Sequence, residues 1–417
     1  MTRFVKGWLG VAATTATLAL GAGQAWAQAK ELVFGFQCDR TGPTANVGAA
    51  LCPGYQDYIA LVNSKGGVEG YKIKVIEIDN EYKVPPAMEA HERFKKEGAV
   101  LEGLYGTPQT AALNKKLEED KILGTSPGFG TSPAADGKRF PYTFPIAASY
   151  WSQGGAAVEF AKEKLGGSLK GKKIAYLFYD NPAGKEPLPI LEDLAKAEGF
   201  ELRTFAVPPP GLEMSAQILD ITGRFKPDFI ITHLFGRAPS VSIKELKGKG
   251  FPLSKVVAFV WGSSEADIIA AGGMGMAEGY NTIQFAGVGK DFPVNKEIEA
   301  MYKAQGKAPP KEMDSTVLYN RGVLIAALHV EATRNAIKAK GGAVPTPEEV
   351  KNGMEKIKGF TLGGLVPPME ITQADHEGGG WVEIWTVKGG KLVKTKEWFQ
   401  GNRPTILKHL AADASKS

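Results

Sequence analysis

Residues 100–130 read VLEGLYGTPQTAALNKKLEEDKILGTSPGFG, and their pattern decides the fold. An apolar run at 100–105 breaks at Gly106-Thr107-Pro108, and a polar helix is predicted at 109–120. A second apolar run at 122–124 leads into a loop that ends at Gly130. Strand, helix and strand in this order are typical of two parallel strands joined by a helical crossover. The stretch therefore predicts a βαβ unit.

Both loops of this unit leave the carboxyl ends of neighbouring strands, where open α/β sheets bind ligands. Both are rich in Gly, Ser and Thr. Glycine lets backbone N–H groups approach a ligand, and a hydroxyl adds a rotatable donor. The composition suits a small anion such as a carboxylate, although ordinary turns have the same composition.

The same alternation extends along the chain. Residues 31–145 predict a doubly wound β-α-β-α-β-α-β series, with strands at 32–37 and 73–79 before the unit above. A second βαβ series of similar size is predicted at 148–276. Further helices are predicted at 294–304, 315–339 and 347–357, followed by a β-hairpin of 381–387 with 392–397. The fold class is therefore α/β with two lobes, and the cleft between them is the expected ligand site.

Residues 1–27 have the features of a secretory signal. Arg3 and Lys6 precede an apolar segment at 7–20, and Ala25-Trp26-Ala27 forms a cleavage site. The alternative is an uncleaved anchor, but the segment is short for a bilayer. We expect a mature periplasmic chain from Gln28. Removal of the two basic residues lowers the formal charge from +5 to +3, which gives no reason to expect nucleic-acid binding.

The chain has two cysteines, Cys38 and Cys52. In an oxidising compartment two thiols this close in sequence are expected to pair. The alternative is two buried free thiols. No histidine lies nearby in the sequence, so a metal site at the cysteines is not expected.

Four short motifs, in order and spacing, carry a resemblance to a known family. They are Thr41-Gly42-Pro43, the segment NSKGGVEG at 63–70, Ser126-Pro127-Gly128 and Asp375-His376. In these motifs the chain resembles the type I periplasmic binding proteins of ABC importers, and in particular their leucine/isoleucine/valine-binding branch. The resemblance covers almost all of the mature chain.

The resemblance implies two lobes that are joined by three crossovers and close on a ligand by a hinge motion. Transferred to this chain, lobe 1 is 31–147 plus 278–359, and lobe 2 is 148–277 plus 360–400, with a C-terminal tail at 401–417. It further implies a monomer that delivers its ligand to an ABC permease in the inner membrane. No cofactor and no metal are implied.

The family's amino-acid site can be transferred residue by residue. Gly106 and Thr107 match the loop that holds the ligand carboxylate, with Ser126 nearby in the next loop. Gly128 and Gly130 occupy positions where the family uses a carbonyl and a hydroxyl, so the hydroxyl is lost. Ala183 stands where the family has a tyrosine, and Phe235 matches a family aromatic.

The acidic residue that pairs with the ligand ammonium is displaced in this chain. It should follow the strand predicted at 256–260, where Trp261-Gly262-Ser263-Ser264 stand, and Glu265 is one or two positions late. A buried ammonium without a carboxylate costs several kcal/mol. If Ser263 replaces the acid, a carboxylate ligand without an amine fits better.

Large aromatic side chains near these loops predict a hydrophobic wall for the site. We expect at least two of the five to be ordinary core residues: Phe129, Tyr150, Trp151, Phe235 and Trp261. The ligand is then an aromatic or hydrophobic organic acid, with branched-chain amino acids as the competing class. Arg237 and Arg321 could form carboxylate forks, but a surface role is the favoured interpretation for both.

Two other functions have some support in the sequence. Gly124-Thr125-Ser126-Pro127-Gly128 matches the G-x-S-x-G motif of hydrolases, but the motif needs a helix directly after the serine, and 129–133 cannot continue one. The five histidines show no partner pattern, so we do not expect an enzyme. A soluble ligand sensor on the same fold, which signals to a separate membrane partner, is the alternative to an importer component.

Overall fold

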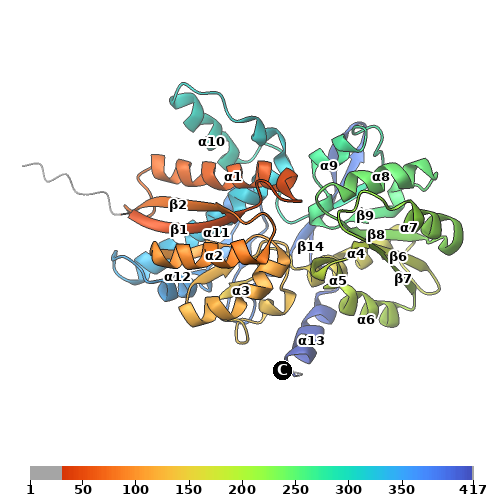
Figure 1. Cartoon of the computed structure of the whole chain (residues 1–417), viewed down its shortest axis with the longest axis horizontal. Helices are drawn as coiled ribbons and strands as arrows, with labels where there is room; N and C mark the ends of the chain where they lie inside the picture. The colour runs from red at the N-terminus through yellow and green to blue at the C-terminus, as the bar shows by residue number, and fades with distance from the viewer. Residues whose placement is uncertain (1–30, 416–417) are drawn as a thin grey trace, which may run out of the picture.

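Two β-sheets organise the chain into two α/β lobes, which lie side by side in Figure 1. The computed structural model describes residues 31–415. The predicted signal sequence at 1–27 lies outside the described residues. The lobe with the N-terminal sheet is called the first lobe below, and the lobe with the larger sheet is called the second lobe.

The first lobe has a parallel five-stranded sheet in the order β2-β1-β3-β4-β5. Its strands are β1 (Glu31–Cys38), β2 (Lys72–Asp79), β3 (Ala99–Gly103), β4 (Leu123–Thr125) and β5 (Thr143–Phe144). Its helices are α1 (Ala45–Ser64), α2 (Val84–Lys96), α3 (Thr107–Asp120), α10 (Pro293–Ala304), α11 (Thr316–Ala339) and α12 (Pro347–Met354). The βαβ unit predicted at 100–130 is therefore confirmed as β3-α3-β4.

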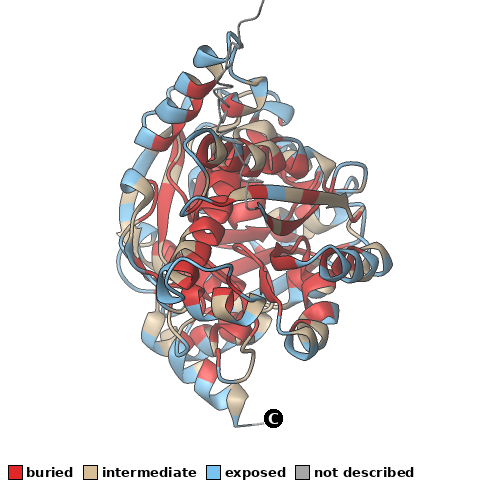
Figure 2. Cartoon of the chain, turned by 90° about the vertical axis from the view of Figure 1, so that its left-hand side faces the viewer, coloured by how far each residue is buried: buried red, intermediate tan, exposed pale blue. Residues whose placement is uncertain are grey.

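Alternating side chains of β1 face helices on both sides of the sheet. Phe36 stacks on Tyr55 of α1, with 3.9 Å between ring centroids, whereas a Cβ at Gly35 would lie 2.5 Å from Phe94 of α2. Strands covered on both faces are hydrophobic along their whole length, which explains the near-continuous apolar run of β1. Figure 2 shows the resulting buried strands inside a shell of helices with exposed outer faces.

Helices α1 and α11 cross with unusually little space between their backbones. A Cβ at Gly322 of α11 would lie 1.9 Å from the carbonyl oxygen of Leu51, and one at Gly54 of α1 would lie 2.2 Å from that of Tyr319. Only glycine permits such an approach. The contact fixes α11, which carries Arg321, against α1 of the first lobe.

The second lobe has a seven-stranded mixed sheet in the order β14-β13-β10-β9-β8-β6-β7. Its strands are β6 (Lys173–Tyr179), β7 (Glu201–Val207), β8 (Phe229–His233), β9 (Val256–Ala258), β10 (Asn281–Gln284), β13 (Val382–Lys388) and β14 (Lys391–Phe399). Its helices are α4 (Tyr150–Lys164), α5 (Pro182–Lys185), α6 (Leu188–Glu198), α7 (Ser215–Leu219), α8 (Ala238–Gly248), α9 (Glu265–Ala270) and α13 (Arg403–Ala414). A small separate sheet pairs β11 (Lys358–Phe360) with β12 (Met369–Glu370). The predicted C-terminal hairpin is confirmed as β13–β14.

Several elements were not predicted from the sequence: β5, α5, β10, β11, β12 and α13. Strand β10 has the sequence NTIQ, whose polar residues hide the strand pattern, and it pairs with β9 and β13 of the second sheet. The boundary at 278, which assigned this segment to lobe 1, differs from that pairing; the other predicted boundaries stay predictions. Residues predicted as a tail form α13, where Arg403 binds the carboxylates of Asp375 and Glu377.

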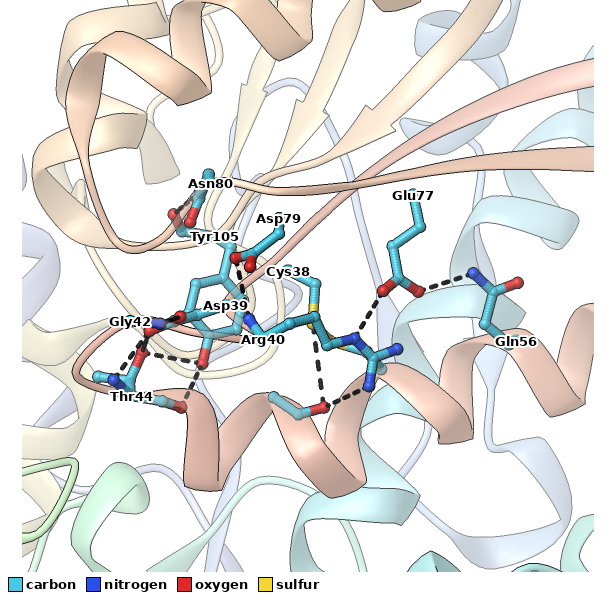
Figure 3. The surroundings of a disulfide bond; sticks show 12 residues. Cys38, Asp39, Arg40, Gly42, Thr44, Gln56, Glu77, Asp79, Asn80 and Tyr105 are labelled. Atoms are coloured by element: carbon cyan, nitrogen blue, oxygen red, sulfur yellow. Dashed lines mark hydrogen bonds and ion pairs between the residues drawn. A yellow bond between two sulfur atoms is a disulfide. The ribbon is translucent and has the colours of Figure 1, made fainter.

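The predicted disulfide is confirmed, because Cys38 and Cys52 are bonded. It joins the end of β1 to α1 and closes the loop between them (Figure 3). Within that loop Asp39 accepts hydrogen bonds from the amide and the hydroxyl of Thr44, at 2.8 and 2.6 Å. The disulfide therefore stabilises the segment that contains Thr44.

Replacement of both Cys38 and Cys52 by Ala should lower the free energy of unfolding by about 2–4 kcal/mol, because the closed loop spans about 15 residues. Denaturant unfolding monitored by circular dichroism would measure the loss. Wild-type protein under reducing conditions should unfold at a midpoint close to that of the double variant. An unchanged midpoint in the variant would show that the bond contributes nothing to stability.

Candidate functional site

A small cavity lies between the two lobes, at the carboxyl ends of the strands of both sheets. Its volume is about 30 Å³, which is room for about two water molecules. Both lobes contribute to its wall: Thr44, Val47, Tyr82, Tyr105, Gly106, Thr107 and Phe129 from the first, and Tyr150, Phe235 and Trp261 from the second. A larger molecule can enter only if the lobes separate or the rings move.

The loop after β3 supplies the main polar part of the wall. Gly106 has a φ of 100°, and a Cβ there would lie 2.0 Å from Oε1 of Gln109, so the position requires glycine. Thr107 is the first residue of α3. The first N–H groups of a helix lack intrahelical partners, and the helix dipole favours negative charge there.

The Thr107 hydroxyl is buried without a hydrogen-bond partner among the described residues. Two tyrosines stand close to Thr107. Burial raises the pKa of Tyr150 well above its usual value, and the Thr107 hydroxyl opposes that shift. Burial likewise raises the pKa of Tyr82, against the effect of the Thr107 backbone amide. The neutral tyrosine hydroxyls and Thr107 together form a group of donors that suits an anion.

Aromatic rings from the two lobes meet across the cavity. The ring centroids of Phe129 and Trp261 are 5.8 Å apart, and those of Tyr82 and Phe235 are 6.0 Å apart. Nearby, Asn46 donates to the backbone oxygen of Gly236 at 3.0 Å. The lobes are therefore in direct contact, and the structure is a closed form.

All five predicted aromatic residues are buried in the hydrophobic core, as expected for at least two of them, and four of the five also line the cavity. The exception is Trp151, whose indole N–H donates to the backbone oxygen of Glu186 at 3.0 Å.

Ser126 is also absent from the wall, and its buried hydroxyl lacks a hydrogen-bond partner among the described residues. No helix follows Ser126 directly, as the hydrolase motif would require.

The carbonyl of Gly128, predicted to face the ligand, is already bonded. It accepts from Nε1 of Trp261 at 3.0 Å and from Nε2 of Gln153 at 2.8 Å. Both donors belong to the second lobe. Gly128 thus joins the lobes in this closed form instead of facing the cavity, from whose wall it is absent.

Neither candidate for the ammonium partner lies on the cavity. Ser263 is buried and donates to the backbone oxygen of Val260 at 2.6 Å, and it also accepts from Arg321. The Glu265 carboxylate accepts from the hydroxyl of Thr316 and the amide of Val317, and so caps the N-terminus of α11. The expectation that Ser263 faces the ligand is not supported by these contacts.

The two arginines have different positions. Arg237 is exposed, as predicted, whereas Arg321 is fully buried, so a surface role for Arg321 is wrong. Arg321 extends from α11 toward the second lobe and donates to the backbone oxygen of Val260 and to Oε1 of Gln284. Its guanidinium lies 5.1 Å from the ring centroid of Trp261, and burial lowers its pKa to about 9.

Four residues of the wall were not predicted from the sequence: Thr44, Val47, Tyr82 and Tyr105. Each lies shortly after one of the strands β1, β2 or β3, so the rule that ligands bind at the carboxyl ends of strands could have found them. Thr44 and Tyr105 share a hydrogen bond at 3.2 Å between their hydroxyl groups, and both appear in Figure 3.

The sequence pattern of the periplasmic binding proteins matches residues 31–391. The chain belongs to this family of binding proteins. A family of this kind implies a location outside the cytoplasm. No helix within residues 31–415 is long and apolar enough to cross a membrane, and the same residues hold no group of three His, Cys, Asp or Glu side chains placed to bind a metal ion.

Among curated proteins, the Leu/Ile/Val-binding protein homolog 1 of Brucella abortus is 28% identical over 174 residues, 42% of this chain and 44% of that protein. The match thus spans less than half of the length of this relative. A solved structure described as an ABC transporter permease from the Pseudomonas fluorescens group is 32% identical, with a TM-score of 0.82, over 93% of this chain and 97% of that one.

The fold also resembles a solute-binding protein of an ABC transporter from R. palustris, solved in complex with benzoate. It is 21% identical, with a TM-score of 0.71, over 88% of this chain and 96% of that one. At this identity the likeness concerns the fold alone.

Replacement of Arg321 by Ala should lower the free energy of unfolding by about 2–4 kcal/mol, because it leaves buried oxygen atoms unpaired and opens a cavity beside Trp261. The exposed Arg237→Ala variant is the matched control and should change stability by less than about 0.5 kcal/mol. Chemical denaturation of both variants would measure the difference. Equal stabilities would contradict a structural role for Arg321.

Proposed function

We propose that this protein is the extracytoplasmic substrate-binding component of an ABC importer and that its cleft binds a small carboxylate ligand without an amine. One observation carries the proposal. The wall combines six aromatic rings with the N-terminus of α3 and the unpartnered Thr107 hydroxyl, and no lining residue, all of which lie within 31–415, is acidic.

The wall of the cavity, whose residues all lie within 31–415, contains no acidic side chain. This bears on the class of ligand. An amino acid would place its ammonium group in an aromatic cavity where Ser263 and Glu265 are bonded elsewhere. A buried charge without a partner costs several kcal/mol. An aromatic or hydrophobic organic acid avoids that cost, and the benzoate complex of the R. palustris protein gives a precedent for such a ligand on this fold.

In this proposal the ligand carboxylate binds at Gly106 and Thr107. The rings of Phe129, Tyr150, Phe235 and Trp261 surround its apolar part. Ser126, Gly128, Trp151 and Ser263 act by supporting those residues, without a contact to the ligand. The ligand enters while the lobes are apart, because the closed cavity is too small to admit it.

The remaining parts of the proposal concern delivery. The protein is secreted through its signal sequence at 1–27, acts as a monomer in the periplasm, and presents its closed form to a permease in the inner membrane. The two lobes move about the crossovers between them.

A thermal-shift screen with paired ligands tests the ligand class. Each of leucine and phenylalanine would be compared with its deaminated acid, 4-methylpentanoate and 3-phenylpropanoate, and benzoate would be compared with benzamide. A ligand at about 100 times its Kd stabilises by about 2.7 kcal/mol, so only the amine-free acids should raise Tm. Shifts with the amino acids alone would instead assign the protein to branched-chain or aromatic amino-acid binding.

Replacement of Thr107 by Val removes the hydroxyl and keeps the side-chain shape. It should weaken binding of the best acid from this screen by about 1–3 kcal/mol, because carboxylate oxygens are left underpaired. Thr107→Ser retains the hydroxyl and should restore most of the affinity. Isothermal titration calorimetry measures both, and equal affinities of wild type and Thr107→Val would remove Thr107 from the site.

A further inference from the structure

Glu186 of the second lobe reaches across to the first lobe. It follows α5, in the connection between β6 and α6. Its Oε1 accepts hydrogen bonds from the backbone amide of Ser132 at 2.7 Å and from the Ser132 hydroxyl at 2.5 Å. Ser132 begins a short 3₁₀ helix between β4 and β5 of the first sheet. One carboxylate oxygen therefore holds two donors of the opposite lobe.

Trp151 at the start of α4 completes this contact. Its backbone amide donates to the Ser132 hydroxyl at 3.2 Å, and its indole N–H donates to the backbone oxygen of Glu186 at 3.0 Å. Ser132 is thus bonded to two second-lobe residues, Glu186 and Trp151, and these bonds join the lobes in the closed form. Trp151, which was predicted as part of the ligand site, serves this contact instead.

The second carboxylate oxygen of Glu186 lies near Gly130, outside the wall of the cavity. A Cβ built on Gly130 would lie 2.3 Å from Oε2 of Glu186 and also 2.3 Å from Cγ2 of Thr107. Glu186 and Thr107 therefore flank the same narrow space over Gly130. Glycine at position 130 leaves this space open, because a side chain there would collide with both residues.

The carboxylate of Glu186 has no ion-pair partner in the described part of the chain. No Lys, Arg or His within residues 31–415 forms an ion pair with Glu186, and the neighbouring Lys185 pairs with Asp180. The titratable groups that face Glu186 are the hydroxyls of Tyr150 on α4 and Tyr176 on β6, whose pKa values are raised by the Glu186 charge in addition to burial. Both tyrosines are neutral in the physiological range.

We propose that Glu186 is a positioning residue that latches the two lobes by holding Ser132 across the cleft, and that formation of the latch takes up a proton. The latch acts on closure and does not require that the ligand be an organic acid. It goes beyond the proposed function, because it predicts that the cleft closes more readily in acidic medium even without ligand.

The direction of the pH effect follows from the two environments of the carboxyl. Burial in the closed form raises the pKa of Glu186 to about 7, although both Ser132 donors oppose the shift. In an open form the group would titrate near its ordinary value of 4.5. The closed form therefore binds the proton more tightly, so closure is favoured below about pH 7 and this advantage is lost as the pH rises through that value.

These values predict that the equilibrium constant for closure is about 30-fold larger at pH 5.5 than at pH 8.5. The test is small-angle X-ray scattering of the ligand-free full-length mature protein at the two pH values. The radius of gyration of the wild type should be smaller at pH 5.5. Glu186→Gln keeps an acceptor for Ser132 but cannot titrate, so its radius of gyration should be the same at both pH values.

Two further variants separate the latch from general effects. Glu186→Ala removes the acceptor and should give the larger radius of gyration at both pH values. Glu192→Gln changes an exposed carboxylate on α6 and should behave as wild type. A pH-independent wild type, or a Glu186→Gln variant that retains the full pH dependence, would overturn the proposal. Because no ligand is added, neither result depends on the ligand class.

Discussion

The carbonyl of Gly128 is the point on which the closed cleft depends. It accepts hydrogen bonds from the indole of Trp261 and the amide of Gln153, both from the opposite lobe. A buried carbonyl without a donor costs about 1–3 kcal/mol, so these bonds favour closure and must be replaced by water on opening. They also place Trp261 against Phe129, which closes one side of the cavity.

Arg321 packs against Trp261 and so helps to hold its position. Its guanidinium lies 5.1 and 4.7 Å from the ring centroids of Trp261 and Phe285, and it donates to the backbone oxygen of Val260. Because α11 is fixed on α1 by the close approach at Gly54 and Gly322, the arginine couples the position of Trp261 to the core of the first lobe. In the closed form Trp261 of the second lobe therefore packs against Arg321, which belongs to the first lobe.

The sequence was sufficient for the features that rest on local patterns. Apolar runs such as that of β1, the helical segment after Thr107 and the spacing of Cys38 and Cys52 specify structure over short distances, and all three predictions are confirmed. The same rule of strand ends located Gly106 and Thr107 at the cavity. Short polar strands such as β10 lack such a pattern and are defined only by their neighbours.

The orientation of side chains across the cleft could not be predicted in this way. Ser263 follows β9 as expected, but its hydroxyl turns to Val260 because a buried hydroxyl needs an acceptor and a backbone oxygen is within reach. Arg321 is separated from its partner Val260 by 61 residues, so no local pattern reveals its burial. The sequence therefore identified Ser263 and Arg321 as candidate residues near the cleft but did not predict their contacts.

The central claim is that the cleft holds a carboxylate at the N-terminus of α3 without an acidic partner for an amine. A crystal structure with the acid that raises Tm most would test it directly. We expect a carboxylate within hydrogen-bonding distance of the amide and hydroxyl of Thr107, with the apolar part between Phe129 and Trp261. A ligand amine bonded to a protein carboxylate, or a carboxylate bound away from Thr107, would contradict it.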